Sequence, residues 1–328
     1  MAAKPRVFVT RMLPQAALDI LSEHCDVVLN EQVVALTRAG LIRRIQGKVG
    51  LVCLPNDRVD DRVLGSSPSL KIVSNVAVGY DNIDVETATR KKIMVTNTPG
   101  VLDETVADFT WTLLLAVARR VVEADTFVRE GRWTEGWMFM GFLGQDIHGK
   151  TLGICGLGRI GQVVARRARG FDMRVLYTQR RRLEKAVERQ LRATYVDKET
   201  LLREADFVSL HLPLTPETVH YIGEGELNLM KRTAILINVA RGPIVDEKAL
   251  VRALKERRIR GAGLDVFERE PRVEKGLLQL RNVVLAPHIG SASRETRTRM
   301  AVVAAQNLVA GVTGRRPPNL VNPEAFVS

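Results

Sequence analysis

A glycine-rich segment between two apolar runs constrains the fold of this chain more than any other part of it. Residues 150–178 read KTLGICGLGRIGQVVARRARGFDMRVLYT. The spacing Gly156-x-Gly158-x-x-Gly161 follows a run typical of a buried strand and precedes a helical pattern, after which a second apolar run begins. Such glycines permit a tight turn, a close approach of the backbone to a pyrophosphate, and close packing of helix on strand. The segment therefore predicts a dinucleotide site, with the phosphates at a helix N-terminus.

The residues after the second apolar run indicate which dinucleotide is bound. An Asp or Glu at this place binds the ribose 2′-hydroxyl of NAD. This chain instead has Thr178, Gln179, Arg180, Arg181 and Arg182. Guanidinium groups pair with a 2′-phosphate, which a carboxylate would repel. We therefore expect NADP(H) to be preferred, with NAD(H) possible; the alternative is that these arginines only form the solvated start of a helix.

Composition limits the class of protein. The chain has 328 residues, 45% of them hydrophobic and 26% charged, which is typical of a soluble protein of two domains. The net charge of +12 raises the question of nucleic acid, but the basic residues are dispersed along predicted helices and form no nucleic-acid-binding motif. No apolar stretch is long enough to span a bilayer. Cys25, Cys53 and Cys155 have neither disulfide nor zinc spacing. We expect a cytoplasmic protein with no metal, nucleic-acid or membrane partner.

Apolar runs alternate with helical patterns along most of the chain. This alternation predicts an α/β protein with parallel sheets, whose ligands bind outside the carboxyl ends of the strands. A long apolar helix is expected to begin at Asp103–Glu104 and to end at Arg119–Arg120, with charges that match the helix dipole. The other predicted helices are 14–24, 36–46 and 293–311, and the predicted strands are 6–10, 26–29, 50–54, 70–75, 152–155, 173–177, 205–211, 233–238, 259–266 and 282–286.

The connection over residues 131–149 has an unusual composition. It reads GRWTEGWMFMGFLGQDIHG and has no clear periodicity. It holds Trp133 and Trp137, two of the three tryptophans of the chain. The segment is expected either to pack between the domains or to form an arm that reaches the pocket of a neighbouring subunit.

Three chemically active side chains follow three successive predicted strands. Arg241, Glu270 and His288 each come shortly after an apolar run. The carboxyl ends of parallel strands face the same crevice as the cofactor, so these side chains are expected to converge. Taken singly, they have plainer explanations as a surface charge, a helix-start carboxylate and a structural histidine. Their common placement beside a dinucleotide site favours catalysis.

The chemistry of this set suits a 2-oxo acid. Arg241 can hold the carboxylate and the carbonyl oxygen in forked geometry. His288 can protonate the carbonyl oxygen as hydride arrives, and Glu270 would favour the charged form of the imidazole. Backbone N–H groups at Val78–Gly79 would hold the other side of the carboxylate, although this loop can equally be a simple tight turn. Asp265 is expected to orient the cofactor amide or to tune the His–Glu pair.

Several stretches together resemble one family over essentially the whole chain. They are VAVGYDNIDV, GKTLGI with GLGRIG, HLPLTPETVHYIG, LINVARGPIVDEKAL, GAGLDVFEREP and NVVLAPHIGSAS. On these motifs the chain is identified as similar to the D-isomer-specific 2-hydroxyacid dehydrogenases. Within that family it looks most like the glyoxylate/hydroxypyruvate reductases, because of LVCLPNDRVD, the Trp/Met-rich stretch ending in FLGQDIHGKT, and YTQRRR.

The resemblance implies a fold and an activity. It implies two doubly wound parallel-sheet domains with a cleft between them: a Rossmann cofactor domain at 99–290 and a flavodoxin-like, discontinuous substrate domain at 1–98 and 291–328. It also implies a homodimer that reduces glyoxylate or hydroxypyruvate to glycolate or D-glycerate. Arg241, Glu270 and His288 would carry the reaction.

The resemblance also implies binding residues. Those for the substrate are Leu54, Val78, Gly79, Trp137, Arg241 and His288. Those for the cofactor are Thr105, Gly156, Leu157, Gly158, Arg159, Ile160, Gly161, Gln179, Arg180, Arg181, Leu212, Pro213, Thr218, Val239, Ala240, Arg241, Asp265, His288 and Gly290.

Two alternatives remain open. One is a D-2-hydroxyacid dehydrogenase that acts on a bulkier 2-oxo acid, because Pro55-Asn56 departs from the pair expected beside the substrate and leaves the pocket size open. The other is a non-enzymatic, NAD(P)-sensing protein like the corepressors of this family, which retain similar catalytic residues.

Overall fold

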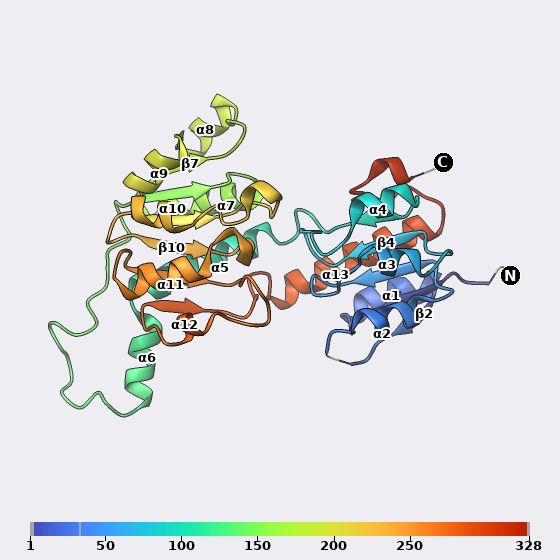
Figure 1. Ribbon diagram of the computed structural model, residues 1–328, viewed down its shortest axis with the longest axis horizontal. Coiled ribbons are helices and arrows are strands. Elements are labelled where there is room, and N and C mark those ends of the chain that lie inside the picture. Colours follow the sequence, from blue (N-terminus) through green and yellow to red (C-terminus); the bar gives the residue numbers. More distant parts are fainter. Residues whose placement is uncertain (1–2, 33, 327–328) are drawn as a thin grey trace. The chain divides into compact units, whose positions relative to one another are not determined.

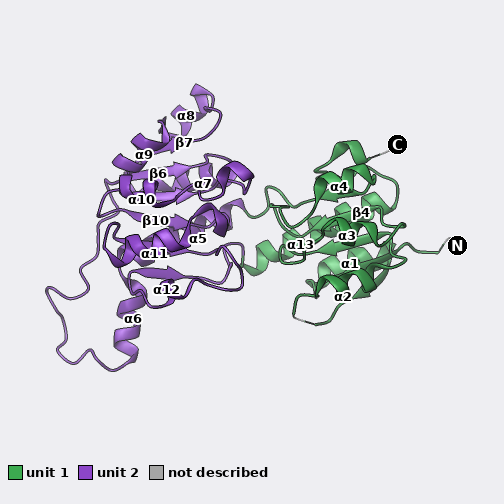
Figure 2. Cartoon of the chain, in the orientation of Figure 1, with its two compact units in different colours: residues 1–102, 292–328 green, residues 103–291 purple. Residues whose placement is uncertain are grey.

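The computed structural model describes residues 3–32 and 34–326. The chain forms two compact units (Figure 2). Unit 1 comprises the chain up to Leu102 and from Ala292 onward, and unit 2 is Asp103–Ser291. Each unit contains one parallel sheet with helices packed against it, so the predicted α/β class is confirmed. No helix of the described chain is long and apolar enough to cross a membrane.

Unit 1 is built on a five-stranded parallel sheet with the order β2-β1-β3-β4-β5 (Figure 1). Helices α1 and α13 pack against each other, and α13 also packs on β3 and β4. Helix α3 contacts both α2 and α4. The elements are β1 Arg6–Val9, α1 Gln15–His24, β2 Asp26–Leu29, α2 Arg38–Ile45, β3 Gly50–Cys53, α3 Asp61–Gly65, β4 Ile72–Asn75, α4 Val85–Arg90, β5 Met94–Thr96 and α13 Arg294–Val312.

Local sequence explains where the helices of unit 1 begin. The side chains of Thr37, Asp60 and Asp84 accept hydrogen bonds from backbone N–H groups in the first turns of α2, α3 and α4. These caps satisfy donors that have no partner within the helix. Strand β5, Met94–Thr96, pairs with β4 at the edge of the sheet and was not among the predicted strands.

Unit 2 contains a seven-stranded parallel sheet with the order β12-β11-β10-β9-β6-β7-β8. One hydrophobic core lies between this sheet and α5 and α7, and a second core contains residues of α9, α10 and α11. The strands are β6 Thr151–Cys155, β7 Arg174–Thr178, β8 Ala193–Tyr195, β9 Phe207–Leu210, β10 Ile235–Asn238, β11 Gly261–Leu264 and β12 Val283–Leu285. The helices are α5 Asp103–Ala118, α6 Val121–Arg129, α7 Arg159–Ala168, α8 Lys185–Leu191, α9 Lys198–Glu204, α10 Glu224–Leu229, α11 Glu247–Lys255 and α12 Lys275–Leu278.

The predicted end of the long helix was wrong. Helix α5 ends at Ala118, and Arg120 adopts a left-handed backbone with φ of 55° before α6 begins. The chain changes direction here without a Gly or Pro, so the sequence carries no visible stop signal. Helix α6 and the connection after it extend away from the sheet of unit 2 (Figure 1).

Candidate active site

The glycine-rich turn joins β6 to α7 as expected, and its glycines have different steric settings. Gly156 has φ of 93°, and a Cβ there would lie 2.8 Å from the carbonyl oxygen of His211. A Cβ on Gly161 would collide with the carbonyl oxygen of Gly156, whereas one on Gly158 would meet no atom within 4 Å. Packing within the protein therefore excludes a side chain at Gly156 and at Gly161. At Gly158 it does not, and the space beside this glycine is open. No side chain caps the amino end of α7, so this geometry fits a pyrophosphate.

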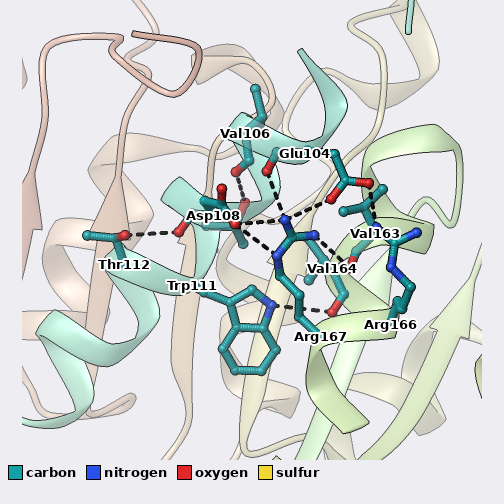
Figure 3. Close-up of polar contacts among 10 residues, drawn as sticks. Glu104, Val106, Asp108, Trp111, Thr112, Val163, Val164, Arg166 and Arg167 are labelled. Atoms are coloured by element: carbon teal, nitrogen blue, oxygen red, sulfur yellow. Dashed lines mark hydrogen bonds and ion pairs between the residues drawn. The ribbon is translucent and has the colours of Figure 1, made fainter. Parts of the chain in front are cut away.

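Helix α7 is fixed by ion pairs and hydrogen bonds to α5 (Figure 3). The guanidinium of Arg167 contacts Glu104 at 2.8 Å and Asp108 at 2.7 Å, and Arg166 also pairs with Glu104. The indole of Trp111 donates to the carbonyl oxygen of Val164 at 3.3 Å. These contacts hold the helix whose amino end faces the predicted phosphate position. Thr105, a predicted cofactor contact, lies in the first turns of α5.

The basic segment after β7 divides into residues with different surroundings. Arg182 pairs with the carboxylate of Glu188 at 2.7 and 2.9 Å and lies over the ring of Tyr195. Gln179 accepts a hydrogen bond from the N–H of Leu157 at 2.9 Å, so it links the basic segment to the glycine-rich turn. Arg180 and Arg181 are exposed, and neither guanidinium forms a hydrogen bond or ion pair with another residue of the described chain.

Arg241 follows β10 in a loop that Asn238 stabilises. The side chain of Asn238 accepts from the N–H of Ala240 at 3.1 Å and donates to the carbonyl oxygen of Arg241 at 2.9 Å. This pattern is a side-chain turn that fixes the backbone locally. The Arg241 guanidinium also donates to the carbonyl oxygen of Ala240 at 2.8 Å. Val239, another predicted cofactor contact, lies in the same loop.

His288 and Glu270 are directly hydrogen-bonded. Nδ1 of His288 lies 2.8 Å from a carboxylate oxygen of Glu270, and both side chains are more than one third exposed. Burial raises the pKa of Glu270, but its hydrogen bond with His288, the charge of His288, the N–H of Phe267 and the charge of Arg241 outweigh burial. The net effect lowers the pKa, so this side chain is a carboxylate at neutral pH. The charge of Arg241 is the last and smallest of these contributions to the lowered pKa.

Asp265, expected to orient the cofactor amide or to tune the His–Glu pair, holds the loop that carries His288. Its carboxylate accepts from the N–H groups of Ile289 and Gly290, each at 2.7 Å, and its backbone oxygen accepts from the N–H of His288 at 2.8 Å. Burial raises the pKa of Asp265 and outweighs the opposing effect of these two N–H donors. The carboxylate thus holds the loop that carries the histidine, which has a left-handed φ of 55°.

The loop that carries Glu270 is also tightly held. Glu247 accepts from the N–H of Glu268 at 2.8 Å, and His220 pairs with the side chain of Glu268 at 2.5 Å. The backbone of Gly242 lies so close to Phe267 that a Cβ would collide with it. These supports could not be predicted from the sequence, because each joins segments that are far apart in the chain.

Arg159 and Ile160 begin helix α7, and the remaining predicted residues lie in three other places. Leu212, Pro213 and Thr218 lie in the loop after β9, where the Thr218 hydroxyl donates to the carbonyl oxygen of Pro213 at 2.7 Å. Leu54, Val78 and Gly79 lie in unit 1, after β3 and β4. Trp137 is 83% exposed, so it is not packed into a core of this chain.

A cavity of about 920 Å³ lies elsewhere in unit 2, at the amino ends of β10, β11 and β12. Its lining includes Arg232, Arg260 and Arg281 but none of the candidate catalytic residues. The catalytic candidates lie at the opposite, carboxyl ends of the same strands, where parallel α/β sheets bind ligands. The described residues contain no group of three or more His, Cys, Asp or Glu side chains arranged to hold a metal ion.

Residues 111–290 match the NAD-binding domain of the D-isomer specific 2-hydroxyacid dehydrogenases. The chain belongs to this family of NAD(P)-dependent oxidoreductases. It is 56% identical over 322 residues to a glyoxylate reductase of Korarchaeum cryptofilum, covering 98% of this chain and 97% of that protein. It is 52% identical to a glyoxylate reductase of Thermococcus litoralis, covering 99% of both.

A solved structure gives the same fold. The NADPH-dependent glyoxylate/hydroxypyruvate reductase of Sinorhizobium meliloti, in complex with NADP and malonate, superposes with a TM-score of 0.86 at 34% identity. The match covers 99% of this chain and 98% of that one. The predicted family is therefore confirmed, and the cofactor is a pyridine nucleotide.

Proposed function

We propose that this protein reduces glyoxylate, and hydroxypyruvate as a second substrate, to the corresponding 2-hydroxy acid with NADPH as the preferred reductant. The observation that carries the proposal is the hydrogen-bonded pair of His288 and Glu270, together with Arg241 in the loop after strand β10. This group follows strands β10, β11 and β12 of the same parallel sheet that carries the glycine-rich turn. The names of the relatives support the substrate class.

Each residue of the group has a defined task in this proposal. The bound reduced nicotinamide supplies the hydride, which adds to the carbonyl carbon. The Arg241 guanidinium holds the substrate carboxylate and carbonyl oxygen by charge-assisted hydrogen bonds. His288 gives its proton to the carbonyl oxygen, and the carboxylate of Glu270 stabilises the charged imidazole that holds this proton. Unit 2 binds the nucleotide, and the family resemblance assigns Leu54, Val78 and Gly79 to the substrate carboxylate.

Steady-state kinetics with a series of 2-oxo acids test the substrate. We expect kcat/KM to be highest with glyoxylate, lower with hydroxypyruvate, and lowest with an acid that carries an aromatic side chain. A preference for the aromatic acid would replace this proposal with the bulkier-substrate alternative. Binding of NADPH without turnover of any 2-oxo acid would favour the non-enzymatic alternative.

The preference for NADPH rests on the segment after β7. Arg182 is already paired with Glu188, so it is not the residue we assign to the 2′-phosphate. Arg180 and Arg181 are exposed beside the carboxyl end of the strand, where this phosphate is expected. The segment holds no carboxylate at this place to bind the ribose hydroxyl of NAD.

Replacing Arg180 by alanine is expected to lower kcat/KM for NADPH by about tenfold to a hundredfold, which corresponds to the loss of one charge-assisted hydrogen bond. The value for NADH is expected to stay within about twofold because NADH lacks the 2′-phosphate. Arg189→Ala is the matched control, since it removes an exposed arginine from the nearby helix α8. Equal losses with both nucleotides, or an effect no larger than that of the control, would contradict the assignment.

We also infer a homodimer, as the family implies. Helix α6 and the connection after it expose Val128, Trp133, Trp137, Phe139 and Met140, each more than half exposed. Apolar side chains gathered in this way mark an interaction surface, and we assign Trp137 to the substrate pocket of the partner. A cytoplasmic location is supported by three unpaired, buried cysteines.

Light scattering during size-exclusion chromatography tests the homodimer. We expect the mass of two chains for the native protein. Replacing Trp137, Phe139 and Met140 together by serine is expected to shift the species towards a monomer, because it removes apolar contact area. A native protein that elutes as a monomer at micromolar concentration would refute the proposal.

A further inference from the structure

A network of buried and half-buried polar side chains lies beneath the two segments of unit 1 that are proposed to bind the substrate carboxylate. Strands β3 and β4 pair in parallel with Cys53 opposite Asn75, so their carboxyl ends lie side by side. Leu54 follows the first strand directly, and Val78–Gly79 follows the second after a short turn. The distance between these two backbone segments determines whether both reach one small anion.

The first segment is fixed by an ion pair with little access to solvent. The carboxylate of Asp57 accepts from the N–H of Leu54 at 2.9 Å, and the N–H of Asp57 donates to the carbonyl oxygen of Leu54 at 3.0 Å. Arg11 contacts the same carboxylate at 3.2 Å, and the hydroxyl of Thr10 donates to it. Asp57 and Arg11 are 1% and 6% exposed. A buried carboxylate without this partner would oppose the binding of an anion nearby.

Two asparagine side chains connect this turn to the second segment. The amide nitrogen of Asn82 donates to the carbonyl oxygens of Leu54 and Asp57, each at 3.1 Å. The amide nitrogen of Asn75 donates to the carbonyl oxygen of Gly79 at 2.8 Å and to the side chain of Asn82 at 3.0 Å. The two candidate anion-binding segments are thus joined through side chains as well as through the sheet.

We infer that Arg11, Asp57, Asn75 and Asn82 form a brace that sets the spacing between Leu54 and Val78–Gly79 and thereby the affinity for a short 2-oxo acid. This inference rests on the proposed function. The four are positioning residues, because they act through the backbone of the segments they hold. The ion pair is neutral overall, so the brace fixes the segments without adding repulsion against the substrate carboxylate. Substrate affinity depends on placing the binding groups to within about an ångström, so residues that fix their backbone affect binding.

The test compares two asparagine variants of the same unit. Asn82→Ser removes the link between the segments, because the shorter side chain does not reach both carbonyl oxygens. Asn322→Ser is the matched control: this buried amide accepts from the N–H of Val95 at 2.7 Å and donates to the carbonyl oxygen of Ile93 at 2.9 Å, and it contacts none of the brace residues. Both variants are expected to lower the unfolding temperature.

Only the brace variant is expected to change substrate binding. We expect Asn82→Ser to raise KM for glyoxylate by about tenfold, the effect of losing one or two hydrogen bonds, with kcat and KM for NADPH within about threefold of the native values. The dissociation constant of oxalate, an unreactive anion of similar size, is expected to rise in parallel. Asn322→Ser should leave all three constants unchanged. Arg11→Lys, which retains the charge, should raise KM for glyoxylate less than Arg11→Met does.

The outcomes separate this inference from the proposed function. If the native protein does not reduce glyoxylate, the proposed function fails, and unchanged oxalate binding by Asn82→Ser then refutes the brace as well. If the native protein is active and both asparagine variants have the same KM for glyoxylate, the brace alone is refuted. If Asn82→Ser does not fold, the comparison of Arg11→Lys with Arg11→Met decides, and equal KM values for the two would overturn the inference.

Discussion

Replacing His288 by alanine is expected to lower kcat for glyoxylate reduction by about a hundredfold to ten-thousandfold, the usual contribution of a positioned general acid. The imidazole is already hydrogen-bonded to the Glu270 carboxylate, and its loop is fixed by Asp265. The dissociation constant of NADPH, measured by fluorescence titration, is expected to change by no more than about threefold, because the adenosine and phosphate contacts remain.

The matched control is His148→Ala, which removes an exposed histidine just before strand β6. This variant is expected to retain native kinetics. Glu270→Gln should lower kcat less than His288→Ala does, because the amide keeps a polar contact with the imidazole but no longer stabilises its charge. Native turnover by His288→Ala would remove the histidine from the proposed reaction.

Replacing Arg241 by alanine is expected to lower kcat/KM for glyoxylate by about a hundredfold to ten-thousandfold. A guanidinium that holds a carboxylate by two charge-assisted hydrogen bonds contributes roughly 3 to 6 kcal/mol, and each 1.4 kcal/mol corresponds to about a tenfold change. Both kcat and KM should change, because the same group contacts the carboxylate and the carbonyl oxygen that gains charge.

Arg241→Lys should recover only part of this loss, since a lysine keeps the charge but not the planar fork. Arg252→Ala is the control: it removes an arginine of α11 that forms an exposed ion pair with Glu224, and such pairs contribute little to stability. Kinetics of Arg241→Ala that match those of Arg252→Ala would exclude the guanidinium from substrate binding.

The parts of the fold that are determined by residues close together in the sequence could be predicted. The glycine spacing with its flanking apolar runs predicted β6, α7 and β7, because the steric demands of Gly156 and Gly161 arise within one short unit. The short strand β8 was missed, and so was the break between α5 and α6. A three-residue edge strand and a left-handed Arg120 leave no strong pattern in the sequence.

At the candidate site, the sequence indicated chemically active residues but not the contacts that hold them in place. The rule that parallel strands present ligands at their carboxyl ends predicted that Arg241, Glu270 and His288 converge, and the structure shows a hydrogen bond between His288 and Glu270. The hydrogen bonds that hold them were not predictable, because they link residues such as Asp265 and Gly290 across a strand and a loop. The brace in unit 1 was hidden for the same reason, since Asn82 is 28 positions from Leu54.

The most direct test of the proposed reaction follows the transferred hydride. Purified protein is incubated with glyoxylate and with NADPH that carries deuterium at the transferable position of the nicotinamide, and the product is analysed by mass spectrometry and NMR. We expect one glycolate for each NADPH oxidised, with one deuterium on the carbon that was the carbonyl carbon. Oxidation of NADPH without deuterated glycolate, or no oxidation in the presence of glyoxylate, would contradict the proposed reaction.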